Sequence, residues 1–183
     1  MKNKKELSWG SSFMRLVSNQ HLIPRMVKRE AKRNKNIIYG GQAMNIQLPG
    51  FLRRLSSFDW DVYTKNPRKS ASRMEKRMDR EIAGGRDDFF VKRAYHKGTY
   101  RVVHEGPDER QKTRDDIPIV DYTTMPKKKP EIVSISGVKY QSVSSIEKEK
   151  EKLLKKPKAK FRHEKDKYDL ESIHAFKKIS RID

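Results

Sequence analysis

The chain has 183 residues, and 34% of them are hydrophobic, which is enough for one compact domain with a real core. Its 44 Lys and Arg residues outnumber its 24 Asp and Glu residues, and the net charge of +20 predicts a polyanionic partner such as nucleic acid, nucleotide phosphates or an anionic membrane surface. The absence of Cys excludes a disulfide scaffold, a thiol nucleophile and a cysteine zinc site. No apolar run is long enough to span a bilayer, and no apolar signal core follows the first residues. We therefore expect a soluble, intracellular (cytoplasmic) protein with no membrane partner.

Residues 1–36 are predicted to form a basic N-terminal helical segment. Apolar side chains recur at three- and four-residue steps between residues 11 and 35, the spacing of a helix with one buried face. Pro24 predicts a bend there, because proline lacks an N–H and its ring clashes with the carbonyl four residues earlier. Most of the excess positive charge lies toward the two ends of the chain, so we expect basic terminal arms.

The next segment predicts a strand, a glycine turn, a helix and a second strand. Residues 37–39 favour a short strand, which Gly40 and Gly41 end. Residues 42–48 predict a short helix stopped by the Pro-Gly pair that follows. Residues 58–63 alternate in polarity and are rich in strand-forming side chains, so they predict the second strand.

The clearest helical pattern follows this second strand. Asn66 is a good N-cap, and Pro67 suits the first helical position. Helical spacing makes one apolar stripe from Ala71, Met74, Met78 and Ile82. Gly84 supplies the stop, because glycine readily adopts the left-handed conformation at a helix end.

The rest of the chain predicts more strands and two final helices. Ser144 and Glu147 are predicted to form a capping box that opens the first of these helices. The expected elements are two strands within residues 89–104 joined by a turn at 96–98, a strand over 117–122, two short strands over 132–135 and 138–140, a helix ending near residue 156 and a helix over 165–179.

Mixed strands with interspersed helices predict an α/β (α+β) fold, a single domain in which helices flank a mixed sheet. We divide the chain into the N-terminal segment 1–36, a core over residues 37–126, and residues 127–183. The last part contains a basic linker, short strands and C-terminal helices that we expect to pack back on the core.

Two acids stand two positions apart in the second predicted strand. Asp59 and Asp61 would leave the same face of that strand, with their backbones about 7 Å apart. Carboxylates so placed can share a pair of Mg²⁺ ions about 4 Å apart, as in phosphoryl transfer. Asp121, near the end of another predicted strand, could complete a metal shell and help activate a hydroxyl. The alternative for the pair alone is two solvent-facing acids on an edge strand.

Gly40 and Gly41 lie between a predicted strand and a predicted helix. Glycines let the backbone approach a phosphate closely, and amides at a helix start bind anions. A simple turn is the alternative reading of such a pair. The combination with the three acids is much more specific than either feature alone.

These motifs resemble the nucleotidyltransferase superfamily of the DNA polymerase beta type. The resemblance is carried by residues 40–45 (Gly-Gly-Gln-Ala-Met-Asn), 59–62 (Asp-Trp-Asp-Val) and 119–122 (Ile-Val-Asp-Tyr). Residues 63–70 (Tyr-Thr-Lys-Asn-Pro-Arg-Lys-Ser) are similar to the region after the acid pair in poly(A) polymerase-like proteins of large DNA viruses. The likeness spans residues 37–173, most of the chain.

The resemblance implies transfer of a nucleoside monophosphate from a nucleoside triphosphate to a hydroxyl, with release of pyrophosphate. ATP is the commonest donor in such families, and Mg²⁺ or Mn²⁺ is the implied cofactor. Asp59, Asp61 and Asp121 are the implied catalytic and metal-binding residues. The implied nucleotide-binding residues are Gly40, Gly41, Gln42, Asn45, Lys65 and Lys165. The alternative for Lys65 is a solvated helix start, and for Lys165 a surface pair with Asp169.

The net charge of +20 favours an RNA 3′ end as the acceptor. The chain leaves no room for the additional RNA-binding domain of full poly(A) polymerases, so we expect a partner protein that supplies acceptor binding. Two other hypotheses stay open at this point. One is a protein- or tRNA-modifying transferase of the toxin type, and the other is a non-enzymatic, basic nucleic-acid-binding protein with its acids on the surface.

Overall fold

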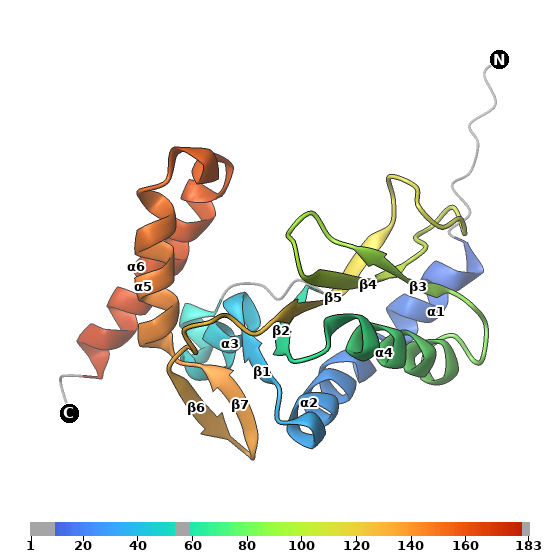
Figure 1. Ribbon diagram of the computed structural model, residues 1–183, viewed down its shortest axis with the longest axis horizontal. Helices are drawn as coiled ribbons and strands as arrows, with labels where there is room; N and C mark the ends of the chain where they lie inside the picture. Colours follow the sequence, from blue (N-terminus) through green and yellow to red (C-terminus); the bar gives the residue numbers. More distant parts are fainter. Residues whose placement is uncertain (1–9, 54–58, 181–183) are drawn as a thin grey trace.

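A computed structural model describes residues 10–53 and 59–180 (Figure 1). The helices are α1 (Ser11–Asn19), α2 (Leu22–Asn34), α3 (Gly40–Gln47), α4 (Pro67–Glu81), α5 (Val143–Leu154) and α6 (His163–Ile179), with the short 3-10 helices η1 (Gly50–Leu52) and η2 (Pro157–Arg162). The strands are β1 (Ile37–Tyr39), β2 (Trp60–Thr64), β3 (Phe89–Arg93), β4 (Thr99–His104), β5 (Ile117–Thr124), β6 (Ile132–Ile135) and β7 (Val138–Gln141).

The seven strands of these ranges form one sheet in the order β3-β4-β5-β2-β1-β7-β6. The pairs β2–β5 and β1–β7 are parallel, and the other neighbouring pairs are antiparallel. The predicted single α/β domain with a mixed sheet is therefore confirmed. β7 pairs with β1, so the strands after residue 127 extend the same sheet.

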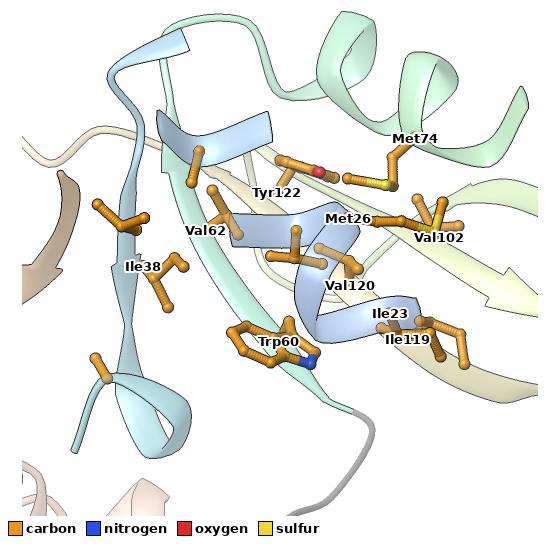
Figure 2. Close-up of a cluster of buried hydrophobic side chains, with 14 of the residues drawn as sticks. Ile23, Met26, Ile38, Trp60, Val62, Met74, Val102, Ile119, Val120 and Tyr122 are labelled. Atoms are coloured by element: carbon orange, nitrogen blue, oxygen red, sulfur yellow. The ribbon is translucent and has the colours of Figure 1, made fainter. Parts of the chain in front are cut away.

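One face of the sheet is covered by α2 and α4 (Figure 1). The strands alternate in polarity, because successive side chains of a strand point to opposite faces. In β2, Trp60 and Val62 are buried on the covered face. In Figure 2, Val62 lies in one apolar cluster with Met26 of α2 and Met74 of α4. The opposite face is left free to carry polar side chains.

The predicted apolar stripe of α4 is confirmed, because Ala71, Met74, Met78 and Ile82 are all buried. Helix α2 of the basic N-terminal segment is likewise amphipathic and packed on the sheet. Ile23, Met26 and Val27 of α2 are buried, whereas Arg25, Arg29, Lys32 and Arg33 are exposed. Burial of one helix face by apolar side chains is what holds such a helix on the sheet.

The helices α5 and α6 lie side by side at one end of the sheet (Figure 1). Lys150 of α5 is buried between them, 2.8 Å from Asp166 Oδ1 and 2.6 Å from Asp169 Oδ2. Both carboxylates belong to α6 and are fully buried. Removing one partner of such a pair leaves an uncompensated buried charge, so this cluster specifies how the two helices meet.

Two local predictions were wrong. The N-terminal helix breaks between Asn19 and Leu22, ahead of the bend predicted at Pro24. Gln20 and His21 keep helical backbone angles, but Pro24 has no N–H to donate to the Gln20 carbonyl, which instead accepts from the Ile23 N–H at 3.1 Å. Pro24 itself fits the first turn of α2, where its missing N–H would have no helical partner.

The N-cap of α5 also differs from the prediction. Ser142, instead of Ser144, caps the helix, and its hydroxyl accepts a hydrogen bond from the Ser145 N–H at 3.1 Å. Glu147 forms ion pairs with His174 and Lys177 of α6. Tertiary pairing therefore takes the carboxylate that the capping box would have used.

The predicted strand over residues 58–63 is observed as β2, two residues later at its start. Phe58, the first residue of that prediction, lies outside the described residues. No helix in the described ranges is both long and apolar enough to cross a membrane.

Ile38→Ala should destabilise the protein by about 2–5 kcal/mol, because it leaves a cavity in the core beneath the interior strand β1. Ile38 is fully buried, whereas Ile132 at the edge of the sheet is 45% exposed. Urea unfolding of Ile38→Ala and of the control Ile132→Ala measures the difference. An equal loss of stability in the two variants would contradict the described packing.

Candidate active site

A row of polar side chains crosses four strands on the open face of the sheet. The β1–β2 register pairs Tyr39 with Asp61, and the β2–β5 register pairs Asp61 with Asp121. The β4–β5 register then pairs Asp121 with Arg101. Residues directly opposite each other on neighbouring strands have Cβ atoms about 4.5–5.5 Å apart. Register alone therefore brings two acids and an arginine into contact distance.

The three predicted acids converge. Asp59, Asp61 and Asp121 each offer a carboxylate oxygen, and these oxygens all lie within 4.8 Å of one another. Asp121 is held in place by Arg101, whose Nε and Nη2 donate to its two carboxylate oxygens, each at 2.6 Å. This bidentate geometry fixes the orientation of a carboxylate.

Burial and mutual repulsion make the ionised acids costly. The pKa of Asp61 is raised to about 7, first by burial and then by the carboxylates of Asp59 and Asp121. The pKa of Asp59 is raised by burial and by Asp121, while Arg101, Lys165 and Arg162 oppose the shift. The nearby cations therefore compensate the acids only in part, and a further positive charge at this point would be stabilised.

The acid cluster fits a hard divalent cation. Its donors are all carboxylate oxygens, the ligands that Mg²⁺ and Mn²⁺ favour. Asp59 Oδ1 is buried and has no hydrogen-bond partner within the described part of the chain. A buried oxygen of this kind costs free energy unless it meets a donor or a cation. Asp59, Asp61 and Asp121 are thus the residues that could hold the metal.

Gly40 must be glycine. Its φ is +68°, a left-handed conformation, and a Cβ added to it would lie 2.6 Å from Asp61 Oδ2. Gly41 follows in the first turn of α3. The diglycine turn therefore lies against the acid cluster, and this position requires the absence of a side chain.

The acids and both glycines line one cavity of about 640 Å³, within the range typical of ligand sites. Four cationic side chains share it: Arg101, Lys150, Arg162 and Lys165. Tyr39 and Tyr63 also line it, with stacked rings whose centroids are 3.7 Å apart. The Tyr39 hydroxyl and Thr123 Oγ1 form a hydrogen bond of 2.9 Å. The cavity thus combines carboxylates, cations and aromatic faces.

Of the other four predicted nucleotide-binding residues, one lines this cavity and three do not. Lys165 lines it, and its charge lowers the pKa of Asp59 and Asp61 against the effect of burial. Gln42 and Asn45 belong to α3, and neither lines the cavity. Lys65 follows β2 and lines a separate hollow beside the start of α4. Their binding roles stay predictions.

Sequence reasoning missed Arg101, Arg162 and the tyrosine pair. Arg101 stands in a predicted strand, and alternation along β4 gives the face it would take. Which acid it meets depends on the β4–β5 register, and a bulge between Val102 and Val103 shifts that register. Tyr39 was visible as the residue before the glycines, but its stacking on Tyr63 requires the pairing of β1 with β2.

The sequence matches no protein-family model and no curated protein. Among solved structures, the fold is similar to Megavirus polyadenylate synthase, with a TM-score of 0.68 and 17% identity over 87% of this chain and 32% of that protein. The chain has a nucleotidyltransferase fold. The predicted resemblance is thereby confirmed at the level of the fold. JHP933 from Helicobacter pylori is also similar, with a TM-score of 0.50 and 14% identity over 84% of this chain and 63% of that protein.

The chain spans about a third of the length of the Megavirus protein, 32% by coverage. This chain combines that shared fold with a cluster of three acids on the open face of its sheet.

Asp61→Asn should remove a pH-dependent loss of stability. The carboxyl group titrates near 3.8 when unfolded and near 7 in the folded protein. The protonated Asp61 carboxyl therefore makes its full contribution to folding stability below about pH 4, and this contribution is lost as the pH rises through 7. In EDTA, the variant should melt several degrees above the parent at pH 8 and nearly match it at pH 4.5. A difference in melting temperature that is the same at both pH values would contradict the raised pKa.

Gly40→Ala should destabilise the protein by about 1–3 kcal/mol and weaken binding of a divalent cation, because the methyl group strains the backbone and displaces Asp61. Gly50→Ala is the matched control, since a Cβ there meets nothing within 4 Å. Thermal melting with and without Mg²⁺ reports both effects. If Gly40→Ala behaves like the control, the close packing of Gly40 on Asp61 is wrong.

Proposed function

We propose that this chain is a divalent-metal-dependent nucleotidyltransferase that moves a nucleoside monophosphate from a nucleoside triphosphate to the 3′ hydroxyl of an RNA. The observation that carries the proposal is the convergence of Asp59, Asp61 and Asp121 within 4.8 Å beside the diglycine turn. Surface acids of a purely structural protein have no reason to be buried together at a free-energy cost.

Asp59 and Asp61 would hold Mg²⁺ or Mn²⁺, and Asp121 would complete the ligand set or orient the acceptor hydroxyl. When bound, the metal supplies charge neutralisation for the transferred phosphoryl group and lowers the pKa of a coordinated hydroxyl. Arg101 acts through Asp121. Its two hydrogen bonds of 2.6 Å hold that carboxylate in one orientation, so Arg101 is a positioning residue.

The triphosphate would lie between the glycine turn and α6. Gly40 and Gly41 leave the start of α3 open, where backbone amides favour anions. Lys165, and with it Arg162, provides positive charge on the other side of the same cavity. In this proposal, these cations would stabilise the charge of the leaving pyrophosphate.

Two observations support RNA and ATP as the substrates. The net charge of +20 favours a polyanionic acceptor. The similar Megavirus protein is named for making polyadenylate. Because this chain spans 32% of that protein, we include in the proposal a partner that adds acceptor binding.

Incubation with radiolabelled ATP, Mg²⁺ and an oligoribonucleotide should extend the RNA, and EDTA should abolish the extension. Asp61→Asn should lower the rate at least about 100-fold, because it removes one ligand charge and misplaces the others. Asp87→Asn, the same change at an exposed acid, is the control and should leave the rate unchanged. Each NTP, tested separately, gives the base preference.

Other outcomes discriminate the remaining hypotheses. Label transferred to tRNA or to a protein, and not to the oligoribonucleotide, would favour a modifying transferase of the toxin type. RNA binding without transfer, unchanged in Asp61→Asn, would contradict the proposal and favour a non-enzymatic nucleic-acid-binding protein.

A further inference from the structure

A second basic depression lies beside the candidate active site, between the start of α4 and the β3–β4 hairpin. It consists of two adjoining hollows of about 620 and 590 Å³ that share Arg68, Ser72 and Tyr100. Because they share these residues, we treat them as one groove. We call it the α4 groove and define it by Lys65, Arg68, Lys69, Arg93, Tyr100 and Thr124, which line it.

The positive charge of the groove is uncompensated in the hollow beside the start of α4. Lys65, Arg68 and Lys69 are exposed, and none of them forms an ion pair among the described residues. The acid that lines the groove, Glu75, lines the other hollow, together with Arg93. The groove is therefore a cationic surface with a free capacity to bind anions.

Helix stability does not explain these cations. The first turn of α4 contains Arg68 and Lys69 and no acid, and Lys65 precedes it. The N-terminal end of a helix is its positive end, so acids stabilise it and bases destabilise it. A cluster of bases at this place is unfavourable for the free protein and becomes favourable when an anion binds.

The α4 groove meets the catalytic cavity at the ends of the same strands. Thr99 and Thr123 line the cavity, whereas the adjacent residues Tyr100 and Thr124 line the groove. Successive strand residues point to opposite faces, so the two hollows lie back to back at the start of β4 and the end of β5. His96, in the turn between β3 and β4, lines the cavity from this side. A polynucleotide strand that leaves the cavity over this turn would enter the groove.

We propose that the α4 groove binds the backbone of a single-stranded RNA acceptor just upstream of its 3′ end. The direction of the strand rests on the proposed function, whereas binding itself rests on the groove. Cations that follow a backbone, together with an aromatic face on which any base can stack, are the features of single-strand sites. Lys65, Arg68 and Lys69 contact phosphates, and the ring of Tyr100 supports a base. We expect duplex RNA to bind more weakly, because its paired bases are not available to stack on Tyr100.

The test compares two triple charge reversals. Lys65→Glu/Arg68→Glu/Lys69→Glu changes the groove, and Lys127→Glu/Lys128→Glu/Lys129→Glu makes the same change of charge in an exposed linker after β5. Fluorescence anisotropy with a labelled single-stranded oligoribonucleotide measures affinity over a range of salt. The groove variant should bind at least about tenfold more weakly than the linker variant. The slope of log affinity against log salt should fall by about 2, because three phosphate contacts are lost.

The groove variant should also fold, which makes a loss of binding interpretable. Its new acids lie at the positive end of α4, so its melting temperature should equal or exceed that of the parent. Equal affinities of the groove and linker variants would overturn the inference, and so would tighter binding of duplex RNA than of the single strand.

Binding needs no turnover, so the inference and the proposed function can fail separately. A protein without transferase activity whose groove variant still loses RNA binding would support the groove and contradict the proposed function. If transfer occurs, the groove variant should raise the KM for RNA about tenfold. Because Lys65 is also a predicted nucleotide-binding residue, the KM for ATP is measured in the double variant Arg68→Glu/Lys69→Glu, which keeps Lys65; this variant should raise the KM for RNA and leave the KM for ATP unchanged. A matching rise in the KM for ATP would assign the groove to the triphosphate and overturn the inference.

Discussion

The site depends on the pairing of Asp61 with Asp121 across the parallel strands β2 and β5. This register places two carboxylates side by side on the open face, and the β4–β5 register adds Arg101 to hold one of them. A shift of one residue would turn either acid into the apolar core on the other face. The free-energy cost of assembling the acids is visible in the raised pKa of Asp59 and Asp61.

The rest of the fold sustains that arrangement. The apolar side chains of the strands pack on α2 and α4, and this packing keeps the sheet rigid beneath the acids (Figures 1 and 2). On the open face, α5 and α6 supply the cationic wall, and the buried cluster of Lys150 with Asp166 and Asp169 determines how these helices meet. Lys165 and Arg162 then reach the cavity from α6 and the turn before it. The apolar core thus supports the strands that carry the acids, and the cations offset part of the cost of the acids' negative charge.

Two cationic surfaces with different characters lie at the ends of the same strands. The cavity combines cations with acids and suits a triphosphate accompanied by a metal ion. The α4 groove carries nearly unopposed positive charge and an aromatic ring, which suit a polynucleotide strand. The alternation of side chains along β4 and β5 separates the two, because Thr99 and Tyr100 face opposite ways, as do Thr123 and Thr124. Donor and acceptor could therefore approach one point from two sides.

The local features of this protein can be predicted from its amino-acid sequence. Periodicity and turn residues predicted nearly all the elements, and spacing predicted that Asp59 and Asp61 share one face of a strand. These features depend on neighbours within a few residues, so the sequence displays them directly. The association of Asp121 and Gly40 with that pair was implied by the family resemblance. Three other features follow from the fold and could not be predicted: Arg101 holds Asp121, Tyr39 stacks on Tyr63, and Lys65 faces a different hollow from Lys165. These contacts depend on strand register and on helix packing between distant segments, where burial and charge compete over the whole domain, and no short motif records that outcome.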